Sequence, residues 1–90
     1  LLDDNVIVNT ALVDMYAKFG ELSKAREVFD KIVVRNVVSW TALIGGYAQC
    51  GYGEEALHCF ALMQAEGLSP DVFTFVSIRR DVLFEGLGIR

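Results

Sequence analysis

Apolar and polar positions along the chain follow a helical period, and the pattern occurs twice. One set of apolar residues falls at i, i+3, i+4 and i+7, which places it on one face of a helix: Ala25, Val28, Phe29 and Ile32. The four positions 31 residues later are also apolar: Ala56, Cys59, Phe60 and Met63. The pattern therefore predicts two amphipathic helices that present equivalent faces to a core.

A further helix is predicted before each of these, over about residues 9–19 and 40–50. Their apolar stripes are expected to be Leu12, Tyr16 and Phe19 in the first helix and Leu43, Tyr47 and Cys50 in the second. Gly20 and Gly51 follow directly, and glycine suits the left-handed cap that ends a helix. Gly45 and Gly46 lie inside the second helix, where we expect a neighbouring helix to approach closely.

The two helical pairs are copies of one repeat. Shifting the chain by 31 residues aligns 6–32 with 37–63, and nine of these 27 positions are identical, against roughly two for unrelated segments. Four segments follow: 1–5, the end of a preceding unit or a linker; 6–36, a unit of 31 residues; 37–71, a unit of 35; and 72–90, a truncated or degenerate third. The predicted fold is an all-α superhelix of helix–turn–helix units, with about two full repeats plus the truncated third.

Composition limits the function classes. Twelve acidic residues against eight basic ones give a net charge of −4, which counts against nucleic-acid binding by this chain alone. The mean hydropathy of +0.39 is high for a free-standing small domain, which favours a piece of a larger protein. No apolar run is long enough to predict a membrane-spanning helix, and no targeting segment is visible.

No catalytic or metal-binding constellation is predicted. Cys50 and Cys59 form neither a disulfide framework nor a zinc pattern, so both are expected to be buried thiols. His58 is the only histidine and has no predicted triad partner. We therefore expect no enzyme activity, no metal and no cofactor.

The segments VVSWTALIGGYAQCGYGEEALHCFALMQAEGLSPD and ALVDMYAKFGELSKAREVFDKI resemble pentatricopeptide repeats. The alternation of a 31-residue with a 35-residue unit resembles the plant subfamily that has long and short repeat variants. This resemblance implies single-stranded RNA binding at one base per repeat, in a mitochondrial or chloroplast RNA processing or editing factor, with further editing or processing factors acting in trans. Two alternatives stay open: a tetratricopeptide-like solenoid that binds protein, and a nonfunctional truncated remnant.

The resemblance also implies which residues contact RNA. The fifth and last residues of a repeat face the base in this family, which gives Thr10 with Asn36 for adenine and Thr41 with Asp71 for guanine. The second residue packs on base faces, which gives Ile7, Val38 and Phe73. Candidate phosphate contacts are Lys18, Lys24, Lys31 and Arg35. From local sequence alone, without the resemblance, the threonines are expected to be first-turn residues near helix starts, and Asp71 an N-cap or turn residue before the third helix.

Overall fold

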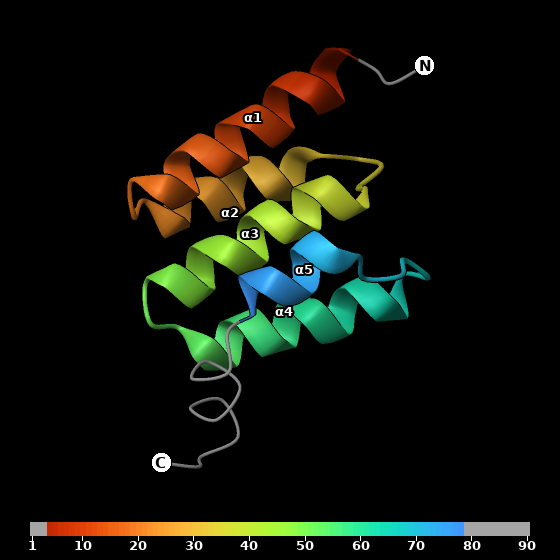
Figure 1. Ribbon diagram of the computed structural model, residues 1–90. Coiled ribbons are helices and arrows are strands. Elements are labelled where there is room, and N and C mark those ends of the chain that lie inside the picture. The colour runs from red at the N-terminus through yellow and green to blue at the C-terminus, as the bar shows by residue number, and fades with distance from the viewer. Residues whose placement is uncertain (1–3, 79–90) are drawn as a thin grey trace.

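The structure, a computed structural model, describes residues 4–78 and contains five helices in this part of the chain (Figure 1). Their bounds are α1 Asp4–Lys18, α2 Leu22–Lys31, α3 Val37–Gln49, α4 Gly53–Ala65 and α5 Val72–Ser77. The all-α prediction is therefore confirmed. The part of the predicted third unit beyond residue 78 lies outside the described residues.

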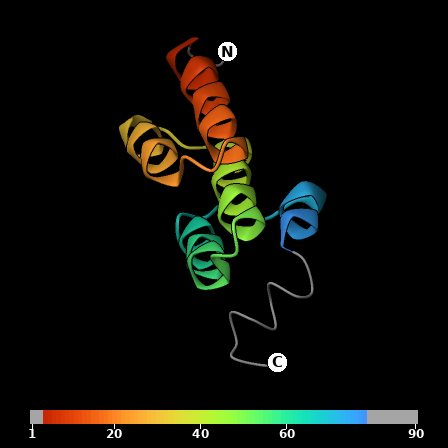
Figure 2. The ribbon, with the colours of Figure 1, turned by 90° about the vertical axis from the view of Figure 1, so that its left-hand side faces the viewer.

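The helices form hairpins that stack on one another. α1 packs against α2, α3 packs against α4, and α1 and α3 pack against each other, while α5 packs on α3. Figure 2 shows α2 and α4 on one side of the α1–α3 column and α5 on the other side of α3. We call α1, α3 and α5 the inner helices, and α2 and α4 the outer helices. No helix between residues 4 and 78 is both long and apolar enough to cross a membrane.

Glycine ends each inner helix of the two hairpins, as the sequence predicts. Gly20 has φ 76° and Gly51 has φ 84°, a conformation that costs other residues free energy because of their Cβ. The Gly20 N–H donates to the Ala17 carbonyl at 3.1 Å, and the Gly51 N–H donates to that of Ala48 at 3.3 Å. These bonds satisfy carbonyls that a helix end would otherwise leave unpaired. The chain can therefore turn tightly into each outer helix.

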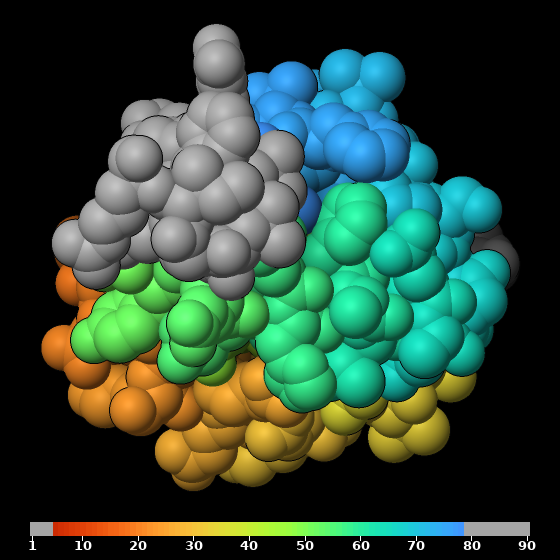
Figure 3. Space-filling model, turned by 90° about the horizontal axis from the view of Figure 1, so that it is seen from below, coloured from red at the N-terminus to blue at the C-terminus, as the bar shows by residue number. Residues whose placement is uncertain are grey.

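The outer helices bury three of the four residues of each predicted apolar face, while Val28 and Phe60 are partly buried against the core. Ala25, Phe29 and Ile32 are buried, and so are Ala56, Cys59 and Met63. The rest of the core comes mainly from the inner helices: Val13, Ala17, Trp40, Leu43, Ile44, Ala48 and Ile78. Seen from below, the surfaces of α2 and α4 adjoin (Figure 3), and Arg26 Nη1 reaches Cys59 Sγ at 3.9 Å.

The stripes predicted for the inner helices are wrong at their ends. Phe19 is 77% exposed, because α1 ends at Lys18 and leaves Phe19 in the turn. Cys50 is the C-cap of α3 and is exposed, so the prediction that both thiols are buried holds only for Cys59.

The inner helices also begin earlier than predicted, at Asp4 and Val37. The reason at α3 is Asn36, whose Oδ1 accepts the Ser39 N–H at 2.9 Å, while the Asn36 N–H donates to Ser39 Oγ at 3.1 Å. This reciprocal capping box fixes the first turn of the helix. Asp71 and Thr74 form the same arrangement at the start of α5.

The predicted four-residue difference between the two units corresponds to a longer outer helix in the second hairpin. α2 has 10 residues and α4 has 13, and Gly67, with φ 84°, then ends α4. The expected close approach of helices is confirmed at Gly46. A Cβ added there would lie 2.5 Å from the Ala17 Cβ of α1.

Candidate nucleic-acid interface

The inner helices line a groove with a volume of about 530 Å³. It brings together six of the seven residues that the sequence analysis assigned to base contacts: Ile7, Thr10, Val38, Thr41, Asp71 and Phe73. The other lining residues are Ala11, Asp14, Ala17, Lys18, Ala42, Gly45, Gly46, Gln49 and Ser77. Residues up to 66 positions apart in the chain (from Ile7 to Phe73) thus share one surface because the hairpins stack in parallel.

Three apolar side chains stand exposed along this groove. Ile7 is 51% exposed, Val38 is 63% exposed and Phe73 is 73% exposed. They occupy the same place in successive units, near the start of α1, α3 and α5 respectively. An exposed apolar residue repeated at one position of every inner helix provides a set of surfaces on which flat, apolar ligand faces can pack.

A polar cluster lies between α3 and α5. Thr41 Oγ1 and Thr74 Oγ1 are 2.8 Å apart, and Thr74 Oγ1 donates to Asp71 Oδ1 at 3.0 Å. The same carboxylate oxygen accepts the Thr74 N–H at 2.9 Å. The two predicted base-reading residues of the second unit are therefore joined through a third residue.

Hydrogen bonds from Thr74 lower the pKa of the Asp71 carboxyl, with the backbone N–H as the largest cause. Asp71 is exposed, so it is an ionised acceptor at the edge of the groove near neutral pH. It is also the N-cap of α5. The two interpretations of Asp71, as a helix cap and as a groove residue, therefore describe one side chain in one position.

The first unit differs from the second at the equivalent place. Thr10 Oγ1 is buried and has no hydrogen-bond partner among the described residues. Asn36 caps α3 as Asp71 caps α5, but it does not belong to the lining of the groove. Thr10 therefore lines the groove with its hydroxyl buried, whereas Asn36, as the N-cap of α3, is not among the lining residues.

The four candidate phosphate contacts do not lie together. Lys18 lines the groove, where its Nζ pairs with Asp14 Oδ2 at 2.9 Å. Lys24 and Lys31 belong to the outer helix α2, and Lys24 Nζ lies 5.9 Å from the centroid of the Tyr16 ring. Asp14 and Asp71 outnumber the single lysine of the groove, so the groove is not basic, in keeping with the net charge of the chain.

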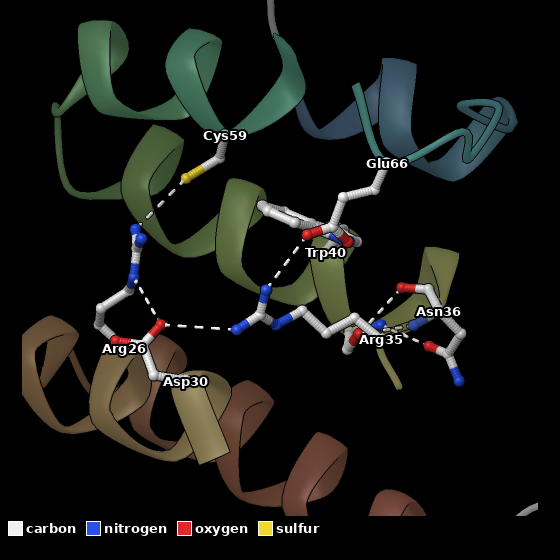
Figure 4. A network of polar contacts seen from close by, with 8 residues as sticks. Arg26, Asp30, Arg35, Asn36, Trp40, Cys59 and Glu66 are labelled. Carbon is white, nitrogen blue, oxygen red and sulfur yellow. Dashed lines mark hydrogen bonds and ion pairs between the residues drawn. The ribbon is translucent and has the colours of Figure 1, made fainter. Parts of the chain in front are cut away.

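Arg35 also lies outside the groove, in a network that joins the two units (Figure 4). Its Nη1 contacts Glu66 Oε2 at 3.2 Å, and its guanidinium lies 4.7 Å from the centroid of the Phe29 ring. Glu66 also accepts the Trp40 indole N–H at 3.3 Å. These contacts direct the guanidinium to a carboxylate and to aromatic rings, so the structure does not support Arg35 as a phosphate contact.

Thr74 is the residue of this polar cluster that the sequence analysis missed; it lies behind the groove lining and is buried. The signal available was the spacing Asp71-x-x-Thr74, which matches the spacing of a capping box. Its contact with Thr41 joins residues 33 positions apart, so it follows from the stacking of α5 on α3. Local sequence carries no information on that distance.

Comparisons with known proteins agree with this architecture. The PPR repeat family matches residues 35–80, and a single PPR repeat matches residues 10–37. A mitochondrial pentatricopeptide repeat-containing protein of Arabidopsis thaliana is 54% identical over 74 residues, which is 82% of this chain and 12% of that protein. A chloroplastic one from the same plant is 41% identical over 86 residues, 96% of this chain and 12% of that protein.

The chain thus spans about an eighth of the length of these relatives. The family match covers more than half of the chain, and the stacked hairpins and glycine caps agree with it. This chain belongs to the pentatricopeptide repeat (PPR) family.

Proposed function

We propose that this chain binds single-stranded RNA in the groove of the inner helices, at one base per unit, as part of a longer organellar protein. Repeats of the PPR family are non-enzymatic RNA-binding units, and the relatives named above are mitochondrial or chloroplastic. The observation that carries the proposal is the groove itself, which gathers Thr10, Thr41 and Asp71 beside exposed Ile7, Val38 and Phe73. The proposal includes a mitochondrial or chloroplast location. It also includes a role in RNA processing or editing, with further factors acting in trans.

The two complete units, 6–36 and 37–71, each contact one base in this proposal. One base packs between Ile7 and Val38 and the next between Val38 and Phe73. Thr10 with Asn36 selects adenine, and Thr41 with Asp71 selects guanine, so the preferred step is 5′-A-G-3′. Asp71 supports the second assignment because an ionised carboxylate only accepts hydrogen bonds, and the Watson–Crick edge of guanine offers two donors.

The unit lengths support the finer subfamily assignment. Alternation of 31 and 35 residues, with the extra turn in α4, fits the subfamily that has long and short repeat variants. Both α1 and α5 pack on α3 despite this difference. Among the basic residues, only Lys18 lines the groove, so we propose it alone as a phosphate contact.

The proposal is tested by titrating the chain with hexanucleotides and following backbone amides by NMR. Two base contacts give dissociation constants on the order of millimolar, which this measurement resolves. UUAGUU is expected to shift the amides near Thr41 and Asp71 at lower concentration than UUAAUU does. Asp71→Asn is expected to reverse that order, because an amide can donate as well as accept.

The matched control is Asp30→Asn, the same change on the outer helix α2, which should leave the preference unchanged. Absence of groove shifts with any hexanucleotide, or an Asp71→Asn variant that keeps the preference for guanine, would refute the proposal. Saturable shifts with an extended peptide but none with RNA would indicate a protein-binding solenoid.

A further inference from the structure

Thr74 lies at the centre of the second base site although it does not line the groove. Its side chain is fully buried, with 0% exposure, and its hydroxyl contacts both Thr41 and Asp71. It also accepts the Asp71 N–H at 3.3 Å. A buried hydroxyl that touches both members of a proposed reading pair can control how each of them hydrogen-bonds.

Counting protons fixes the direction of these hydrogen bonds. A threonine hydroxyl has one proton to donate and two lone pairs. Because an ionised carboxylate has no proton, the bond between Thr74 Oγ1 and Asp71 Oδ1 uses the Thr74 proton. The 2.8 Å contact with Thr41 therefore uses the Thr41 proton, and Thr41 is its donor.

This direction determines what the site offers to a ligand. Thr41 donates its hydroxyl proton to Thr74, so the Thr41 hydroxyl presents only lone pairs toward the groove. Asp71 presents only carboxylate oxygens. The site between α3 and α5 therefore consists only of hydrogen-bond acceptors. Without the contact to Thr74, the hydroxyl of Thr41 could also donate a hydrogen bond to a ligand.

The first unit lacks this arrangement. Ser39 stands where Thr74 stands in the third unit, and its hydroxyl donates to the Asn36 backbone carbonyl at 2.9 Å. Thr10 Oγ1 finds no partner among the described residues. Its hydroxyl proton is therefore not committed to a neighbouring hydroxyl–carboxylate pair as that of Thr41 is, and the Asn36 amide keeps its donors.

We propose that Thr74 is a specificity-determining positioning residue, which makes the site between Thr41 and Asp71 acceptor-only and thereby selects a base edge with two adjacent donors. This inference rests on the proposed function and deepens it. Guanine, with N1–H and the N2 amino group, is the base that fits. Adenine presents an acceptor at N1 and would face the lone pairs of Thr41.

Two variants separate the hydroxyl of Thr74 from its packing. Thr74→Val has nearly the same shape and keeps the backbone N–H that Asp71 caps, but it removes the hydroxyl. Thr74→Ser keeps the hydroxyl. Each is titrated, as above, with UUAGUU, with UUAAUU, and with a hexanucleotide in which inosine replaces guanosine and so lacks the N2 amino donor.

In the wild type we expect the order guanine, inosine, adenine in decreasing affinity. Thr74→Ser should keep this order. Thr74→Val should lose up to about tenfold of the guanine-over-adenine preference, the size of one ordinary hydrogen bond, because Thr41 is then free to donate to adenine N1. The amide shifts near Thr10, caused by the adenine that all three hexanucleotides share, should be unchanged in both variants, which serves as an internal control.

A second measurement does not require RNA. The ¹³C chemical shift of the Asp71 carboxyl, followed against pH, should titrate at a higher pKa in Thr74→Val and at the wild-type pKa in Thr74→Ser. The hydroxyl protons of Thr41 and Thr74 should exchange slowly with water in the wild type, and this test is independent of whether any variant folds. Fast exchange of both would overturn the inference.

The outcomes distinguish the inference from the proposed function. If the wild type binds no hexanucleotide, the proposed function fails. If the wild type prefers guanine and Thr74→Val keeps that preference, the inference fails while the proposed function stands. A uniform loss of affinity for all hexanucleotides in Thr74→Val would assign Thr74 a purely structural role and would also overturn the inference.

Discussion

The contact between α1 and α3 at Gly46 is the closest test of how the two units are stacked. In Gly46→Ala, the new Cβ would lie 2.5 Å from the Ala17 Cβ, 3.3 Å from Leu22 Cδ2 and 3.4 Å from the Ala17 Cα. Carbon atoms pack at about 3.5–4.0 Å. Because the Ala17 Cβ is fixed to the backbone, the clash is relieved only if the two helices separate by about 1 Å.

Two opposing terms set the magnitude. Alanine is about 1 kcal/mol more favourable than glycine inside a helix, whereas forcing an extra carbon into a packed interface costs about 1–3 kcal/mol. The separation also weakens the contacts of the buried residues that lie around Gly46. We therefore expect Gly46→Ala to lower the free energy of unfolding by about 1–2 kcal/mol.

Gly45→Ala is the matched control, since it is the same substitution one residue earlier in α3. Its Cβ would lie 3.5 Å from Ser77 Oγ and 3.7 Å from Ser77 Cβ, which is ordinary contact. Only the preference of alanine over glycine inside a helix then applies. Gly45→Ala should therefore be more stable than the wild type by about 0.5–1 kcal/mol.

Thermal and urea unfolding followed by circular dichroism measure both variants. A change of 1 kcal/mol shifts the Tm of a domain of this size by about 4–8 °C, so the two variants should melt clearly apart on opposite sides of the wild type. A double-mutant cycle adds Ala17→Gly, which removes the opposing Cβ and should make Gly46→Ala less costly. Equal stability of Gly46→Ala and Gly45→Ala, or no coupling to Ala17, would refute the stacking described above.

Two further predictions concern single side chains. Burial raises the pKa of the Cys59 thiol, while Cys50 is exposed. A disulfide reagent near neutral pH should therefore modify Cys50 quickly and Cys59 only after unfolding, which peptide mass spectrometry would show. Rapid modification of Cys59 in the folded chain would contradict its buried position. In the folded chain the pKa of the Asp71 carboxyl lies below its ordinary value of 3.8. Its contribution to stability is therefore present above that ordinary value and is lost as the pH falls through the lower, folded pKa. The Tm of the wild type should fall more steeply in acid than the Tm of Asp71→Asn, and parallel acid profiles of the two Tm values would contradict this.

Local sequence determined the hairpins and their turns, because the signals for these features lie within a few residues. Gly20 and Gly51 ended helices as predicted, and the apolar faces of α2 and α4 were buried. The inner helices were harder to predict. α3 contacts α1, α4 and α5, so its buried residues do not form one stripe. Its start depended on the Asn36 cap, which the sequence analysis had considered only as a base-reading residue.

The candidate site was predictable only in part for a similar reason. The family resemblance, rather than local physics, supplied Thr10, Thr41 and Asp71, and the groove then gathered them. The role of Thr74 depends on a 2.8 Å contact between two stacked units, which no local pattern encodes. Arg35 was assigned to phosphate because it is basic, but Phe29 and Glu66 surround its guanidinium, and these partners come together only in the folded chain.

The geometry explains how units of different length can line one groove. The extra residues of the second unit lengthen α4 on the outside, whereas Asn36 and Asp71 each remain the N-cap of the next inner helix. The position of the last residue of a unit is therefore set by the helix that it caps, and the number of residues that precede it has little influence. The proposed base site consequently belongs to two units: Thr41 comes from one inner helix, and Asp71 with Thr74 comes from the start of the next. A single hairpin of this kind would contain no complete site, so the stacking of inner helices that stabilises the solenoid also brings together the residues proposed to read the base.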